Sequence, residues 1–132
     1  MRLSNIFFPE ESRGFPGKRW GNVIFRSLHL CGMAVYTGGL YFDVAAPLLT
    51  PWYIATAASG LLMMGADIYS NGKWIFQNRG FLIIIKILIL GILHHSTINP
   101  IWPVLWIIFA SGLISHGTAT FRYYSIFHRR QI

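Results

Sequence analysis

Four apolar stretches dominate the sequence, and each is long enough to cross a lipid bilayer as a helix. Charged residues make up only 11% of the 132 residues, whereas a soluble domain carries about 25%. The connections between the stretches are short, so consecutive helices should run antiparallel as neighbours. We therefore expect an all-α polytopic membrane protein, an antiparallel four-helix transmembrane bundle. Its spans would cover Asn22 to Phe42, Leu48 to Tyr69, Phe81 to about Ile98, and Ile101 to about Phe121.

Lys and Arg fall on one side of these spans, with the single exception of Lys86. Cytoplasmic loops carry an excess of Lys and Arg, so the pattern predicts that both termini are cytoplasmic, in a bacterial inner membrane. The net charge of +7 then reflects topology and attraction to anionic lipid, and we expect no nucleic-acid partner. The chain would divide into an N-terminal interfacial arm at 1–21, a transmembrane domain at 22–121 and a basic cytoplasmic tail at 122–132. The one-sided cations are Arg2, Arg13, Lys18, Arg19, Arg26, Lys73, Arg79, Arg122, Arg129 and Arg130.

Each predicted span carries one ionisable residue in its cytoplasmic half: His29, Asp67, Lys86 or His116. At a helical rise of 1.5 Å per residue, these residues lie about 4 to 10 Å from the inner span ends. Ionisable groups inside a membrane are costly and normally face the bundle interior or one another, so a polar cluster is expected. In a purely structural interpretation, Lys86 extends to the interface beside Asp67, and the histidines make neutral interhelical hydrogen bonds.

Two histidines on different helices at similar depth also match the axial ligands of a haem iron. In this interpretation His29 and His116 bind the metal, and a b-type haem is the cofactor. Its propionates would meet the cations of Arg26, Lys86 and Arg122 near the cytoplasmic surface. Small residues along the spans would make room for the macrocycle, although they also permit close helix packing. These residues are Gly32, Gly38, Gly39, Ser59, Gly60, Gly65, Ser111 and Gly112.

A second group of candidate ligands lies at the opposite end of the spans. Asp43 follows the first span, and His94 and His95 end the third. Both histidines are expected to lie at the interface near water. The alternative is that one of them binds copper or zinc together with Asp43, since adjacent histidines point about 100° apart on a helix. The sequence contains no phosphate-binding loop, and its four acidic residues do not suggest hydrolysis by paired carboxylates. A single cysteine excludes an internal disulfide.

Two stretches of the sequence, RSLHLCGMAVYTGGLYF and FLIIIKILILGILHH, resemble a known family. They are similar to the first and third spans of the bacterial membrane-bound protoporphyrinogen oxidases and the related copper-resistance protein D-like membrane proteins. The resemblance implies a helical bundle that binds b-type haem. It makes His29 the match for the family's first-span histidine and Lys86 the match for its intramembrane lysine.

Two classes of function follow from these observations. The first is a small membrane protein that binds b-type haem and serves electron transfer or porphyrin and redox chemistry, with enzymatic activity left open. The second is a non-catalytic accessory subunit that packs against the other subunits of a larger membrane complex through its apolar outer faces. Its arm and its tail, TFRYYSIFHRRQI, would then be docking segments.

Overall fold

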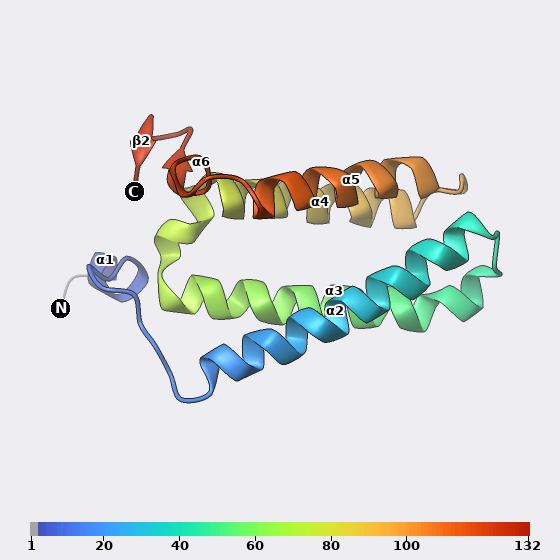
Figure 1. Cartoon of the computed structure of the whole chain (residues 1–132), viewed down its shortest axis with the longest axis horizontal. Helices are drawn as coiled ribbons and strands as arrows, with labels where there is room; N and C mark the ends of the chain where they lie inside the picture. The colour runs from blue at the N-terminus through green and yellow to red at the C-terminus, as the bar shows by residue number, and fades with distance from the viewer. Residues whose placement is uncertain (1–2) are drawn as a thin grey trace.

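The computed structural model describes residues 3–132, and its regular structure is almost entirely helical (Figure 1). The prediction of an all-α fold is confirmed, because the one sheet in the described residues is a short antiparallel hairpin. Residues 1 and 2 of the predicted arm, with the cation of Arg2, lie outside the described residues. The elements are α1 (Leu3–Phe7), α2 (Lys18–Tyr41), α3 (Ala46–Ser70), η1 (Gly72–Phe76), α4 (Asn78–His94), α5 (Ile101–Ser115), α6 (Ala119–Tyr123), β1 (Tyr124–Ser125) and β2 (Arg130–Gln131).

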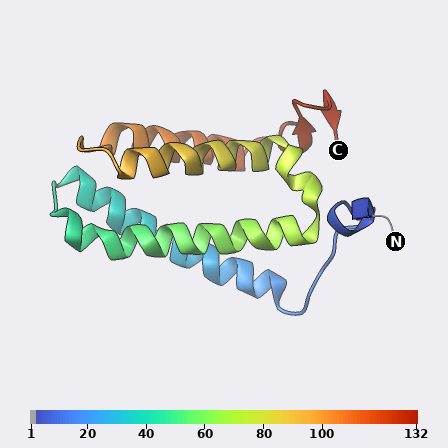
Figure 2. The same ribbon diagram turned by 180° about the vertical axis from the view of Figure 1, so that it is seen from behind.

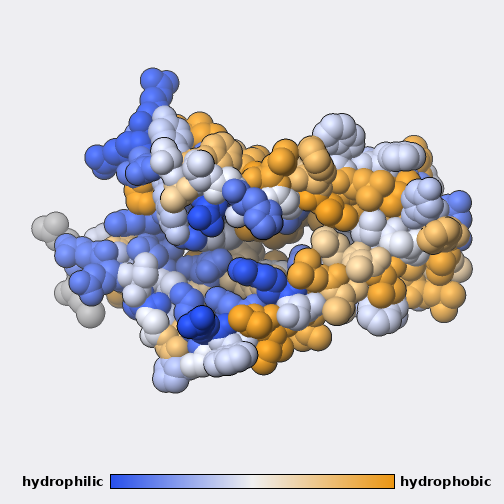
Figure 3. Space-filling model, viewed as in Figure 1, coloured by the Kyte–Doolittle hydropathy of each residue, from blue (hydrophilic) through white to orange (hydrophobic). Residues whose placement is uncertain are grey.

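The four long helices form two layers, α2 with α3 and α4 with α5, as both opposite views show (Figures 1 and 2). The turns that join α2 to α3 and α4 to α5 lie at one end of the molecule. The described ends of the chain lie at the other end, beside η1. Hydrophilic residues gather at the end near the termini and hydrophobic residues at the far end and along the helices (Figure 3).

Among the described residues, α2 and α3 are long and apolar enough to cross a membrane. The helices α4 and α5 are shorter, with 17 and 15 residues. At 1.5 Å per residue, α5 spans about 23 Å, less than the ~30 Å of a hydrocarbon core. It ends at Ser115 rather than near Phe121, because a turn at His116 and Gly117 separates it from α6. The third predicted span likewise ends at His94 rather than near Ile98.

Glycines bring α2 and α3 close together. A Cβ atom added at Gly32 would lie 2.6 Å from Thr56 Oγ1, and one added at Gly39 would lie 2.1 Å from Leu49 Cδ2. Small residues at such points let two helix backbones approach. These two glycines therefore serve helix packing, which was one of the two roles considered for the small residues.

Few large apolar side chains are buried, whereas many along the long helices are exposed. Leu28, Ile54, Ile92 and Trp106 are more than half exposed, and they come from α2, α3, α4 and α5 respectively. Soluble monomeric proteins rarely expose apolar surface on this scale, so lipid or another protein is expected to cover it. The buried apolar side chains among residues 3–132 are Tyr36, Leu49, Trp74 and Val104.

The predicted arm and tail both pack against η1 and the residues that flank it. The Asn71 side chain donates to the carbonyl of Pro9 in the arm. On the other side, the buried Gln77 side chain donates to the carbonyl of Ile132 at 2.8 Å. The buried Asn78 side chain donates to Phe121 at 2.9 Å. These three contacts join segments that are far apart in the sequence into one end of the molecule.

Candidate functional site

His29 lies half-buried on α2 and faces α3. Its Nδ1 is 2.8 Å from the carbonyl oxygen of Thr56 and 3.2 Å from Ser59 Oγ. A carbonyl oxygen only accepts hydrogen bonds, so Nδ1 carries the proton and Nε2 keeps its lone pair. A Cβ at Gly60 would lie 3.1 Å from the His29 ring, so the glycine makes room for the imidazole. The helix pair thus orients one imidazole and leaves one ring nitrogen available as a ligand.

The partners of His29 could have been found in the sequence. Tyr53, Thr56 and Gly60 follow one another at spacings of three and four residues, which places them on one face of a helix. That face of α3 meets α2, where His29 contacts Thr56 and Tyr36 packs 5.4 Å from the ring of Tyr53. The spacing thus indicates the face of α3, whereas its pairing with His29 depends on how the two helices are rotated about their axes.

Lys86 lies between α4 and α5. Its Nζ donates to Ser111 Oγ over 3.3 Å, and Ser111 Oγ in turn donates to the carbonyl of Ile107 within α5. One of the three N–H donors of Lys86 is therefore bound to a polar group on the neighbouring helix.

Asp67 lies in α3, near the end of the molecule that carries the termini and the cations of Arg79, Lys18 and Arg26 (Figure 1). The Lys18 ammonium group donates to the hydroxyl of Ser70. Asp67 and Lys86 belong to two separate polar groups in the structure, one at the end of the helices and one further in.

His116, the second predicted iron ligand, is exposed and caps the end of α5. Asn99 Nδ2 donates to the carbonyl of Leu40, which aligns the far ends of α2 and α5. His29 lies inside α2, whereas His116 follows the last residue of α5. That the two histidines ligate one iron stays a prediction.

Arg122, predicted as a third propionate partner, lies on α6 beyond the last long helix. Its guanidinium is 5.9 Å from the ring of Tyr123, and its Nε is buried without a hydrogen-bond partner in the described residues. An unsatisfied donor of this kind is available to an anion that enters this end of the molecule.

At the far end of the helices, His94 packs against an aromatic ring and does not pair with Asp43. The ring of His94 stacks on Tyr53, with centroids 3.7 Å apart and planes 3° from parallel. Asp43 instead accepts from Asn99 Nδ2 at 2.8 Å. Within residues 3–132, no three His, Cys, Asp or Glu side chains gather as metal ligands would. His95 lies beside His94, with ring centroids 5.6 Å apart.

Comparisons with known proteins return no matching family, curated protein or solved structure. The resemblance to the protoporphyrinogen oxidase and copper-resistance protein D-like families therefore rests on the two stretches that contain His29 and Lys86. It stays a prediction, and any proposal of function must be argued from the geometry of this chain.

Proposed function

We propose that this chain is an integral protein of a bacterial inner membrane, with α2, α3, α4 and α5 crossing the bilayer as an antiparallel bundle. Three observations support this proposal. Apolar side chains are exposed on all four helices, and the cations gather near the termini. The ammonium group of Lys86 donates a hydrogen bond to Ser111 on the neighbouring helix. The cationic end then faces the cytoplasm. The short α5 would be accommodated by local thinning of the bilayer.

Reporter fusions test this topology directly. A reporter that is active only in the cytoplasm should be active when fused after Gln131, and a reporter active only in the periplasm should be active when inserted at Ala46, the first residue of α3. A periplasmic signal at Gln131 would overturn the proposed orientation. An equal cytoplasmic signal at both positions would overturn the crossing itself.

Within the bundle, we propose that His29 binds the iron of a b-type haem. The observation that carries this proposal is the hydrogen bond from His29 Nδ1 to the Thr56 carbonyl. Metal-ligating histidines almost always donate their second ring N–H to a carbonyl or carboxylate, which fixes the tautomer and raises the basicity of the ligating nitrogen. A protein-bound haem supplies one-electron chemistry whose potential depends on its axial ligands and burial.

The other predicted contacts fit this haem unequally. Lys86 has one hydrogen-bond partner, Ser111 Oγ at 3.3 Å, so two of its N–H donors remain for a propionate. Arg122 Nε has no partner among the described residues, and Arg26 lies in the first half of α2. His116 is the proposed second axial ligand, and its exposed position makes it the weaker part of the proposal.

An absorption spectrum of the purified protein tests the haem proposal. Protein from haem-replete cells should show a Soret band and low-spin b-type bands, which His29→Ala should abolish. His116→Ala should convert the spectrum to high-spin if His116 is the second ligand. His94→Ala is the matched control, because this histidine stacks on Tyr53 at the far end. Absence of a Soret band in the wild type, or an unchanged spectrum in His29→Ala, would overturn the proposal.

A second candidate, the accessory subunit, is favoured by a stripe of large side chains on α5. Trp102, Trp106, Phe109 and Leu113 follow one another at spacings of four, three and four residues, so they share one face. Each of these side chains is about 60 to 70% exposed. Exposed tryptophan residues are typical anchors of protein interfaces. Colourless protein that loses a co-purifying membrane subunit on Trp106→Ala, but not on Trp20→Ala at the opposite end, would support this candidate.

A further inference from the structure

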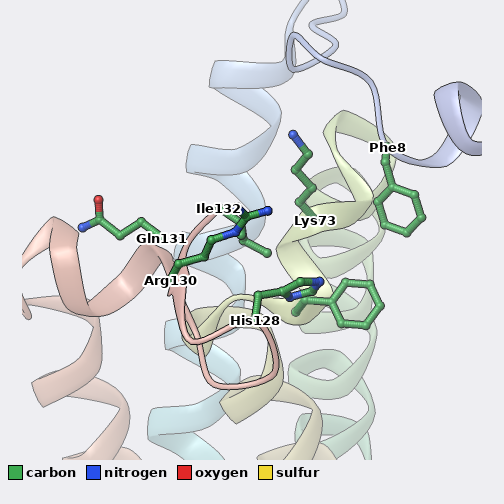
Figure 4. Close-up of a pocket in the computed structure, with 7 residues that line it drawn as sticks. Phe8, Lys73, His128, Arg130, Gln131 and Ile132 are labelled. Carbon is green, nitrogen blue, oxygen red and sulfur yellow. The ribbon is translucent and has the colours of Figure 1, made fainter.

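Three segments that are distant in the sequence surround one cavity beside η1 (Figure 4). Phe8 comes from the arm, Lys73 and Phe76 from η1, and His128 and Arg130 from the C-terminal hairpin. The cavity has a volume of about 470 Å³. It is separate from the His29 and Lys86 groups, which lie between the long helices, and neither proposal above assigns it a role.

The lining of this cavity is suited to an anion. Lys73 and Arg130 bring two formal positive charges, and the described residues that line the cavity include no Asp or Glu. Hydrogen bonds from charged donors to phosphate or carboxylate oxygens are about twice as strong as neutral ones. Two cationic side chains around one space, with no acidic side chain among the described lining residues, favour a negatively charged occupant.

The His128 imidazole is held at the wall of the cavity. Ser125 is fully buried, and its Oγ accepts from the backbone N–H of His128 and lies 2.9 Å from His128 Nδ1. When the serine hydroxyl donates to Nδ1, the proton of a neutral imidazole lies on Nε2. The ring packs edge-on against Phe76, with centroids 5.7 Å apart. The hairpin turn thus orients a polar ring that lines the cavity together with Lys73 and Arg130.

Hydrogen bonds also hold the walls in place. The Lys73 backbone N–H donates to Asn71 Oδ1 at 3.0 Å, which fixes the start of η1. Gln77 Nε2 donates to the Ile132 carbonyl, and the Ile132 N–H donates to the Tyr123 carbonyl at 3.1 Å. The hairpin that carries Arg130 is therefore attached to η1 without the cavity being filled. A site with prearranged donors loses less entropy on binding.

We propose that this cavity binds the phosphate group of an anionic phospholipid from the inner leaflet. The proposal rests on the membrane orientation proposed above, which places η1 and the hairpin at the cytoplasmic surface, where anionic lipids concentrate. The rings of Phe8 and Phe76 suit the glycerol and upper acyl region of a lipid, which a free phosphate ion lacks. Phe127, 60% exposed next to this cavity on the same hairpin, extends the apolar surface.

Native mass spectrometry of the full chain in detergent tests this site. Phosphatidylglycerol should bind with one tight site, and phosphatidylcholine should not. Lys73→Gln and Arg130→Gln should each weaken the first phosphatidylglycerol by about fivefold, as expected for one cation near an anionic lipid. Arg129→Gln is the matched control, because it removes the same charge from the same hairpin without lining the cavity. Arg130 is exposed, so Arg130→Gln is expected to leave the fold intact. If Lys73→Gln fails to fold, Arg130→Gln alone decides the test.

Each other outcome overturns the proposal in a recognisable way. An equal loss in Arg129→Gln would mean attraction to overall charge rather than a site. Displacement of the lipid by millimolar inorganic phosphate would assign the cavity to a soluble phosphate compound. Equal binding of phosphatidylcholine would remove the role of charge. The readout is independent of haem and of topology, because a colourless protein, or one with a periplasmic tail, would still report lipid binding in detergent.

Discussion

The two helix pairs of this protein are held together in different ways. Between α2 and α3, glycines at positions 32 and 39 have partner atoms where a Cβ would be. On α4 and α5, a Cβ at Gly91 or Gly112 would meet nothing within 4 Å, and the contact that crosses between the helices is the hydrogen bond from Lys86 to Ser111. In a bilayer, apolar surface gives helices no driving force to associate, so close packing and polar bonds carry the association. The first pair combines close packing with polar bonds from His29 to Thr56 and Ser59, whereas on α4 and α5 the polar bond from Lys86 has no such glycine contact beside it.

The sharpest way to break this comparison is to add bulk to each pair. Gly32→Leu should lower the free energy of unfolding by about 3 kcal/mol, because the added atoms meet the Thr56 side chain and the backbone of Thr56 and Trp52. Gly112→Leu is the control and should change it by less than about 0.5 kcal/mol. Unfolding in mixed micelles with increasing sodium dodecyl sulfate, followed by circular dichroism, measures both. Equal losses would show that the pairs are packed alike.

The next largest loss of stability is expected at Gln77, in the segment that connects the two helix pairs. Gln77 is buried, and its side chain both donates to Ile132 and accepts from Arg79 Nε at 2.7 Å. Gln77→Ala leaves both partners without their bond and should cost about 2 kcal/mol. Gln131→Ala, at an exposed position on the hairpin, is the control. Limited proteolysis should release the C-terminal hairpin faster in Gln77→Ala, and an unchanged rate would contradict the assigned role.

The long helices were predictable from the sequence, but the contacts of the connecting segment were not. The apolar runs in α2 and α3 are strong local signals, and these helices agree closely with the predicted spans. The end of α5 was missed because Ile101 to Phe121 was treated as one apolar run, although Gly117 and the N-cap Thr118 are ordinary stop and start signals. The contacts of Gln77 and Asn78 span more than 40 residues of sequence, so no local pattern indicates them.

The candidate site was predictable to a similar, limited extent. His29 and Lys86 stand out because ionisable residues in apolar runs are expensive, and both indeed have polar partners on neighbouring helices. The predicted depth of His116 assumed that the last helix continues to Phe121, whereas α5 ends at Ser115. Which polar partner each residue finds depends on how the helices rotate about their axes, and the sequence alone does not fix that rotation.

Removing the polar bond of the second pair should have a smaller effect. Ser111→Ala leaves Lys86 Nζ without its partner and should cost about 1 kcal/mol, in the range measured for interhelical hydrogen bonds in membranes. In haem-free protein, Lys86→Met removes the charge as well as the bond and should be neutral or stabilising, since no ammonium group is left between the helices. The same micelle unfolding assay measures both. A larger loss in Lys86→Met than in Ser111→Ala that occurs only in the haem-bound protein would support the proposed propionate contact.

The smallest expected effect is at the far end, where the two pairs meet again. Asn99 Nδ2 donates to the Leu40 carbonyl and to Asp43 Oδ1, both at 2.8 Å, but all of these groups lie near the surface. Water replaces exposed hydrogen bonds at little cost, so Asn99→Ala should lower the free energy of unfolding by about 0.5 kcal/mol. A disulfide crosslink between Cys variants of Leu40 and Asn99 should still form in Cys31→Ser protein, since packing keeps the ends close. If Asn99→Ala instead lowers the free energy of unfolding as much as Gln77→Ala does, the two helix pairs are held equally at both ends. The contrast between the buried contact of Gln77 and the exposed contact of Asn99 is then wrong.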